Sequence, residues 1–264
     1  MTEIISKEPT MFRFADSKKT KLKFLYSACL IFLLLMSAKP LIAQVSRFTG
    51  WGAVINSIKI NSKVNFIFDA QIRSTDDWAN TETTIIRPGI SYSTGKATSL
   101  SVGLALIQNL KSLGGVNDRV ADNRLWQQFI FNQPVGLNLL QHRIRLEERT
   151  IATLFAEGNE LKKKNGKFNA RFRYFNRYIA AFNRGEKLSK GPYWAIQNEF
   201  FFNVAGLSSV NKKLFDQSRT YIGAGWRLSS KSDLELGYML QHIEGKGEGY
   251  TNNHILQLST FLRL

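Results

Sequence analysis

Eleven segments of this 264-residue chain alternate between apolar and polar side chains. In residues 63–73, Phe66 and Phe68 lie on one face, whereas Asp69 and Arg73 lie on the other. A period of two is typical of a β-strand whose faces meet different surroundings. No stretch of useful length shows a helical period. The segments lie near residues 47–60, 63–74, 83–93, 98–110, 122–133, 139–151, 168–182, 193–204, 216–228, 233–243 and 253–264.

The segments are too long for an ordinary soluble sandwich. Strands in such folds usually have about five or six residues, whereas a tilted strand needs about 9–11 residues to cross a bilayer. The connections alternate between tight turns (94–97, 135–138 and 229–232) and long loops (111–121, 152–167, 205–215 and 244–252). This alternation is typical of an outer-membrane barrel. We therefore predict an all-β fold, a transmembrane antiparallel up-and-down β-barrel of about 10–12 strands.

The number of strands conflicts with the usual rule for such barrels. If both termini are periplasmic, the number should be even. We therefore expect either that 47–60 is not a full crossing, which leaves ten strands, or that a further strand exists, which gives twelve.

The first 43 residues have the pattern of a signal peptide. Lys18, Lys19, Lys21 and Lys23 precede the apolar run 24–38. The run of about 15 residues is short for a spanning helix, which needs about 20. We predict cleavage behind Ala43, which leaves residues 44–264 as a single barrel domain; an uncleaved anchor helix is the alternative. A lipoprotein cleavage at Cys29 would leave too short an apolar run.

The charge of the chain invites a nucleic-acid partner, but the leader argues against one. The formal net charge is +16, and residues 1–43 carry seven bases and three acids, so the mature chain keeps +12. The single cysteine lies within the leader, which excludes a disulfide framework and a cysteine-based zinc site. We expect a protein of the Gram-negative outer membrane, with no nucleic-acid partner, no cofactor and no metal.

Two further patterns agree with a membrane barrel. Aromatic side chains fall on the apolar face near the tight-turn ends of their strands, as in an interfacial girdle. They are Tyr92, Tyr178, Trp194 and Trp226. The last segment places Leu256, Leu258, Leu262 and Leu264 on one face. We expect this strand to be recognised by the barrel-assembly machinery.

A set of short motifs resembles a known family. The motifs are Trp51, Asp69–Arg73, Arg87–Tyr92, Arg124–Gln128, Arg143–Arg149, Arg171–Tyr174, Asn198–Phe200, Gln217–Arg219 and Gly237–Tyr238. In this order they resemble the DUF2490 family, over nearly the whole mature chain. The resemblance implies a Bacteroidetes-type outer-membrane barrel without an assigned activity. It supplies no catalytic residues.

The polar faces of two neighbouring segments, 139–151 and 168–182, carry a stripe of arginines. The stripe comprises Arg143, Arg145, Arg149, Arg171, Arg173 and Arg177. We predict the acidic partners Asp69, Glu147, Glu199 and Glu235 in the same lumen. Guanidinium groups in a confined lumen attract carboxylates and phosphates, which predicts a porin-like conduit or binding site for small anionic solutes. The alternative is a self-satisfied network that fills a narrow barrel.

A lipid-modifying enzyme, either a hydrolase or an acyltransferase, is the second hypothesis. It requires a rim serine with a histidine base, or a pair of carboxylates. We expect His142, His242 and His254 on the lipid-facing or rim side, with no serine and aspartate beside them in one strand register. The enzyme hypothesis therefore needs a neighbouring strand to bring Ser259 near one of them. We predict no catalytic residues and a non-enzymatic barrel. The lysines at 162–164 and 212–213 fall in expected outer loops, where they can bridge lipopolysaccharide phosphates.

Overall fold

The computed structural model describes residues 44–183 and 188–264, and this part of the chain is built from β-strands. The strands are β1 (Gln44–Lys59), β2 (Val64–Ser74), β3 (Thr81–Ser93), β4 (Thr98–Leu113), β5 (Val116–Ala121), β6 (Arg124–Val135), β7 (Asn138–Glu157), β8 (Glu160–Ala181), β9 (Gly191–Ala205), β10 (Phe215–Ser229), β11 (Ser232–Glu244) and β12 (Tyr250–Arg263). Two short 3-10 turns, η1 (Asp76–Trp78) and η2 (Leu207–Ser209), lie in connections. Among the described residues, no helix has the length and apolar character needed to cross a membrane. The predicted signal peptide lies outside the described residues.

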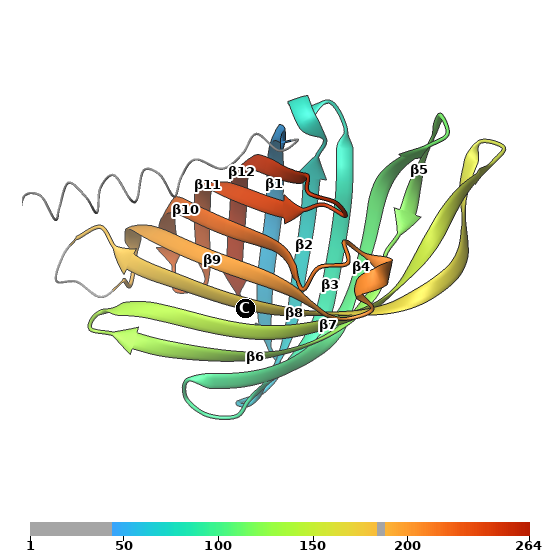
Figure 1. Ribbon diagram of the computed structural model, residues 1–264. Helices are drawn as coiled ribbons and strands as arrows, with labels where there is room; N and C mark the ends of the chain where they lie inside the picture. The colour runs from blue at the N-terminus through green and yellow to red at the C-terminus, as the bar shows by residue number, and fades with distance from the viewer. Residues whose placement is uncertain (1–43, 184–187) are drawn as a thin grey trace, which may run out of the picture. The chain divides into compact units, whose positions relative to one another are not determined.

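Eleven of these strands close into a barrel (Figure 1). Each barrel strand pairs with its neighbours in sequence, and β6 follows β4 in the ring because β5 pairs only with β4 among the described strands. The ring closes where β1 pairs with β12. The predicted all-β barrel is therefore confirmed.

The closing pair differs from the fully antiparallel arrangement that we predicted. β1 and β12 run parallel, with register partners from Gln44 and Tyr250 at one end to Ser57 and Arg263 at the other. In an up-and-down chain with an odd number of strands, the first and last strands necessarily run in the same direction. The expectation of an even number is therefore wrong. The start of β1 lies at the long-loop end, whereas Leu264 lies at the tight-turn end, where its N–H donates to the carbonyl of Ser57.

Two of the expected long loops are extensions of the sheet instead. β4 and β5 form a hairpin over much of 111–121, and β7 and β8 continue pairing to Glu157 and Glu160. Both hairpins project beyond the barrel (Figure 1). Asp118 joins them, because its carboxylate accepts the backbone N–H of Leu161 at 3.0 Å as well as that of Arg119 at 2.6 Å. These two hydrogen bonds lower the pKa of Asp118.

The two faces of the barrel wall are chemically opposite. The outer face carries large exposed apolar side chains, such as Leu104 (50% exposed) and Ile222 (57%). The inner face buries arginines, carboxylates and amides together with a few aromatic rings. Leu104, Phe172, Ile222 and Leu236 are each more exposed than the residues on either side of them, as the alternation in the sequence predicts. Along β2, Phe68 and its neighbours are all half-buried.

The four aromatic residues of the predicted girdle lie near the tight-turn ends of their strands. Tyr92 and Trp226 are 45% and 52% exposed. Tyr178 and Trp194 lie on neighbouring strands β8 and β9, and their ring centroids are 5.3 Å apart. This placement gives one end of the outer face an aromatic border.

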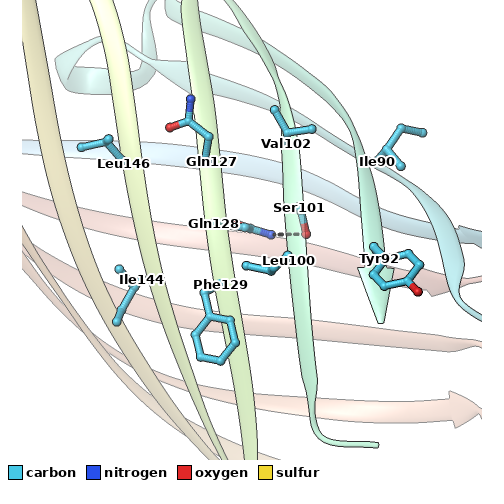
Figure 2. Close-up of a pocket in the computed structure, with 10 residues that line it drawn as sticks. All are labelled: Ile90, Tyr92, Leu100, Ser101, Val102, Gln127, Gln128, Phe129, Ile144 and Leu146. Carbon is cyan, nitrogen blue, oxygen red and sulfur yellow. Dashed lines mark hydrogen bonds between the residues drawn. The ribbon is translucent and has the colours of Figure 1, made fainter. Parts of the chain in front are cut away.

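A shallow apolar hollow of about 530 Å³ crosses the outer face over β3, β4, β6 and β7. Figure 2 shows the side chains that line it. Eight of the ten form two rows in register, Ile90–Val102–Gln127–Leu146 and Tyr92–Leu100–Phe129–Ile144. The other two, Ser101 and Gln128, are buried polar residues. Gln127 is the polar member of these rows. The hollow therefore has the chemistry of a surface that packs against hydrocarbon.

Candidate functional site

The centre of the lumen holds a buried ion-pair cluster. Arg173 on β8 donates to Glu147 on β7 and to Glu199 on β9, with a distance of 2.6 Å between its NH2 group and Glu199 Oε1. Glu147 and Glu199 are only 2% and 3% exposed. All three residues have the inward phase of their strands, and the register of β7, β8 and β9 brings them together.

Each of the two carboxylates has more than one arginine partner. Glu147 also accepts from Arg124 at 2.9 Å and from Arg171 at 2.8 Å. Glu199 also accepts from Arg143 at 2.8 Å. The pairs continue to Arg145, Arg149, Arg219, Asp122 and Asp216, which makes one connected cluster of seven arginines and four carboxylates. The cluster therefore has an excess of three positive charges.

An aromatic ring supports the cluster from within. Phe201 on β9 has no exposed surface, and three guanidinium groups approach its ring. The distances from its ring centroid are 4.5 Å for Arg173, 4.7 Å for Arg219 and 5.0 Å for Arg171. Arginine suits this position because a planar guanidinium can contact an aromatic face while it still donates from its edge.

All six arginines of the predicted stripe face the lumen, and each has a carboxylate within 4 Å. Arg149 pairs with Asp122 at 3.0 Å, and Arg177 pairs with Glu235 at 2.5 Å. Arg145 is the weakest case, since Glu147 lies 3.8 Å away and the amide of Gln128 accepts its hydrogen bonds. The stripe itself is thus largely neutralised.

The predicted acids lie in three separate places. Glu147 and Glu199 belong to the central cluster, whereas Glu235 lies deeper toward the tight-turn end with Arg177. Asp69 pairs with Arg87 at 2.8 Å, outside the predicted stripe.

The sequence analysis missed the arginines that β2, β3, β6 and β10 add to the lumen. They are Arg73, Arg87, Arg124 and Arg219. Their inward phase is visible in the alternation, but a single arginine on a separate strand does not by itself indicate a shared site. Closure of the barrel brings Arg73 of β2 and Arg219 of β10 to the indole ring of Trp51 on β1.

A polar cavity of about 180 Å³ lies in the long-loop half of the lumen. Its lining includes six arginines and one carboxylate, and the rest is apolar or amide and hydroxyl groups. The charged lining residues are Arg73, Arg87, Arg124, Arg171, Arg173, Arg219 and Glu147. Asn109 and Arg73 at its border are partly exposed. The cavity is thus a positively charged recess at this end.

Tyrosine rings fill the tight-turn half of the lumen. Tyr193 and Tyr221 are each 1% exposed, and the hydroxyl of Tyr221 donates to Glu235 at 2.9 Å. Their rings lie against wall glycines; a Cβ at Gly225 would overlap Tyr193, and one at Gly237 would overlap Tyr221. Glycine at these positions therefore gives large rings room inside a narrow barrel.

The residues of the enzyme hypothesis do not form a site. Ser259 is fully buried on the inner face, where it accepts a hydrogen bond from Gln257 at 2.8 Å. The three histidines have the outward phase instead. His142 and His254 contact the hydroxyls of Tyr174 and Tyr238 at 2.9 Å and 2.6 Å. His242 contacts Asn252 and Glu244. The approach of Ser259 to a histidine that the enzyme hypothesis needs is not found among the described residues, because Ser259 and the histidines have opposite phases on the barrel wall. Within residues 44–183 and 188–264, no group of three or more His, Cys, Asp or Glu side chains can hold a metal ion.

Comparison with known families agrees with the sequence motifs. Residues 48–252 match the family model described as protein of unknown function DUF2490. The chain belongs to the DUF2490 family. It matches no curated protein. Among solved structures, an anion-selective porin from Comamonas acidovorans matches with 13% identity and a TM-score of 0.32, over 75% of this chain and 55% of that chain. This DUF2490 protein thus spans about half the length of that porin.

Proposed function

We propose that this DUF2490 protein is a non-enzymatic, porin-like barrel of the Gram-negative outer membrane that holds small anionic solutes in its lumen. The observation that carries the proposal is the surplus of guanidinium groups in the central ion-pair cluster and the polar cavity beside it. Seven arginines share four carboxylates there, and Arg73 has no carboxylate within 4 Å among the described residues. A confined positive site of this kind attracts anions from solution.

The outer face supports a membrane location. Leu104, Ile222 and Leu236 are each at least 50% exposed, and they belong to an apolar surface that continues around the barrel. Such a surface exceeds the exposed apolar patches of a typical soluble monomer. A bilayer covers it without cost, since closure of the barrel pairs the backbone groups of the wall.

The filled half of the lumen favours binding over free passage. The cavity is lined by residues of the long-loop half, whereas Tyr193 and Tyr221 occupy the other half. We therefore expect an anion to enter and leave by the long-loop end. An open conduit would require these rings to move.

The projecting hairpins and the last strand suggest two further partners. The exposed lysines 162–164 and Lys167 on β8 present positive charge at the long-loop end, where lipopolysaccharide phosphates lie. The outward leucines of β12 are the surface that we expect barrel-assembly machinery to recognise.

The test combines location with anion binding. We expect the mature protein in the outer-membrane fraction, with heat-modifiable migration in detergent. At low salt, the folded barrel should bind phosphate or chloride in equilibrium dialysis and not potassium. Binding should weaken above about 0.1 M salt because exposed charges are screened. Recovery in the soluble periplasm, or the absence of anion binding, would contradict the proposal.

In planar bilayers, we expect little current through the wild-type barrel. A large ohmic conductance with no ion preference would show instead that the lumen is open and that its arginines do not select.

A further inference from the structure

Two of the cavity arginines, Arg73 and Arg219, have weaker contacts with carboxylates than most arginines of the predicted stripe. Arg73 donates from NH2 to the amide oxygen of Gln71 at 2.7 Å, and its buried Nε has no hydrogen-bond partner. The NH1 group of Arg219 lies 3.6 Å from Oε2 of Glu199, and this carboxylate also pairs with Arg143 and Arg173. Arg73 therefore keeps hydrogen-bonding capacity for a ligand. Arg219 donates from Nε and NH2 to the amide oxygen of Gln241, at 3.3 Å and 3.2 Å, so its main contribution to the cavity is positive charge.

Trp51 holds these two arginines at one place in the lumen. The guanidinium carbons of Arg73 and Arg219 lie 3.8 Å and 5.1 Å from its ring centroid. The ring is nearly buried on β1, at 9% exposure. Contact with an aromatic face offsets part of the repulsion between two like charges. The tryptophan thus keeps Arg73 and Arg219 together although their only carboxylate within 4 Å among the described residues is Glu199, which also pairs with Arg143 and Arg173.

The cavity adds a third basic group and neutral polar groups. Arg87 lines the cavity from β3, and its buried Nε lacks a hydrogen-bond partner although its NH2 pairs with Asp69 at 2.8 Å. Thr83, Asn109, Gln217 and Gln241 supply further hydroxyl and amide groups to the lining. The volume of about 180 Å³ has room for one small anion with some water.

We infer that Arg73, Arg219 and Arg87 form a binding site for phosphate or a small phosphomonoester, with Trp51 as the positioning residue for the first two. This inference rests on the proposed function and names the ligand class of the same lumen. The ligand enters the long-loop half, where its oxygens accept from the edges of guanidinium groups on β2, β3 and β10.

The number of donors favours phosphate over a simple carboxylate. A carboxylate offers two oxygens and one charge, and one guanidinium fork satisfies it. A phosphate group carries about −1.5 to −2 charge at pH 7 and presents at least three strong acceptor oxygens. Three guanidinium groups from three strands therefore match a phosphate group better than a carboxylate. The excess of three charges in the adjoining cluster favours the dianion further.

Titration of the folded, detergent-solubilised barrel with inorganic phosphate tests the inference. Arg73→Gln and Arg219→Gln should each weaken phosphate binding by about 10- to 100-fold, the loss of one hydrogen-bonded charge. Arg73→Lys should fall between the wild type and Arg73→Gln, since it keeps the charge but not the fork. Arg47→Gln removes an exposed rim arginine paired with Glu82 and should leave binding unchanged. Heat-modifiable migration shows that each variant is folded.

The possible outcomes separate the two proposals. Tighter binding of phosphate than of acetate or chloride, lost in both glutamine variants, supports the site. Phosphate binding that is unchanged in folded Arg73→Gln and Arg219→Gln overturns the site but leaves anion binding by the lumen intact. Equal affinity for acetate and phosphate overturns the ligand class. No binding of any anion to the wild type overturns both this inference and the proposed function.

Discussion

Arg173 donates two hydrogen bonds to one oxygen of Glu199, from Nε and NH2 to Oε1, at 3.1 Å and 2.6 Å. The remaining NH1 group donates to Glu147. One guanidinium thus links carboxylates from the strands on either side of β8. Such a buried link is costly to break, because removal of the guanidinium leaves two carboxylates with one partner fewer in a poorly solvated lumen.

Arg173→Gln should therefore destabilise the barrel. We expect a loss of about 3 kcal/mol in the free energy of unfolding, at the low end of the range for a broken buried pair, since Glu147 and Glu199 keep other arginines. Urea titration in detergent or lipid measures it. The double variant Arg173→Gln/Glu199→Gln should recover part of the loss. The exposed control Arg47→Gln should change stability by less than about 0.5 kcal/mol. A fully stable Arg173→Gln would show that the pairs do not support the fold.

The glycines beneath the tyrosines give a second prediction. A Cβ at Gly237 would overlap the ring of Tyr221, so Gly237→Ala should cost about 1–3 kcal/mol by overpacking. The matched control is Gly247→Ala, because nothing lies within 4 Å of a Cβ there. Adding Tyr221→Leu to Gly237→Ala should restore part of the lost stability. If Gly237→Ala and Gly247→Ala have equal urea midpoints, the ring does not occupy this part of the lumen.

The sequence was sufficient to predict the barrel, because the period of two assigns each side chain to a face without knowledge of the neighbouring strand. It also placed Arg145, Arg173 and Glu147 on one inner surface. The parallel closure was not predictable in this way, since the pairing of β1 with β12 joins opposite ends of the chain. The hairpin of β5 was missed for another reason: its six residues are too few to show a clear alternation.

The candidate site was predictable only in part. Neighbouring strands can be paired from their order, which is why the carboxylates of β7 and β9 were expected near the arginines of β8. Arg73 and Arg219 reach one ring from β2 and β10, on either side of the closing strands. The curvature of the closed sheet brings Arg73 and Arg219 to the same ring, and the periodicity of the sequence does not predict this curvature. The same curvature decides which arginines remain without a carboxylate of their own.

The outer face gives a third prediction. Ile222 is 57% exposed on β10, and its register partners on both sides, Ile196 and Tyr238, are outward as well. Ile222→Arg should cost about 2–4 kcal/mol in a lipid bilayer if the residue lies near the midplane. Ile222→Leu is the conservative control and should fold normally. Equal stability of the arginine and leucine variants in lipid vesicles would show that this face does not contact hydrocarbon.

The contact between the two projecting hairpins should depend on pH. The N–H groups of Leu161 and Arg119 lower the pKa of Asp118 below its usual value of 3.8. The ionised carboxylate therefore stabilises the contact above pH 3.8, and this stabilisation is lost as the pH falls through the lowered pKa. Hydrogen exchange at Leu161, corrected for the intrinsic pH dependence, should show protection at pH 7 that is lost in strong acid. Asp118→Ala should lack the protection at both pH values; protection that survives in this variant would exclude Asp118 as its cause.

The parallel closure predicts the positions of the chain ends. Ser46 pairs in register with Asn252, close to the connection between β11 and β12, so it lies at the same end of the barrel as Ser208 in η2 and at the opposite end from Ser230 in a tight turn. The mature chain contains no cysteine once residues 1–43 are removed, so each serine can be replaced singly by a unique thiol. With a bulky, membrane-impermeant maleimide on intact cells, Ser46→Cys and Ser208→Cys should react alike, whereas Ser230→Cys should react only after the outer membrane is opened. An even-numbered barrel would place Ser46 with Ser230. Labelling of Ser46→Cys in step with Ser230→Cys would therefore contradict the eleven-strand closure.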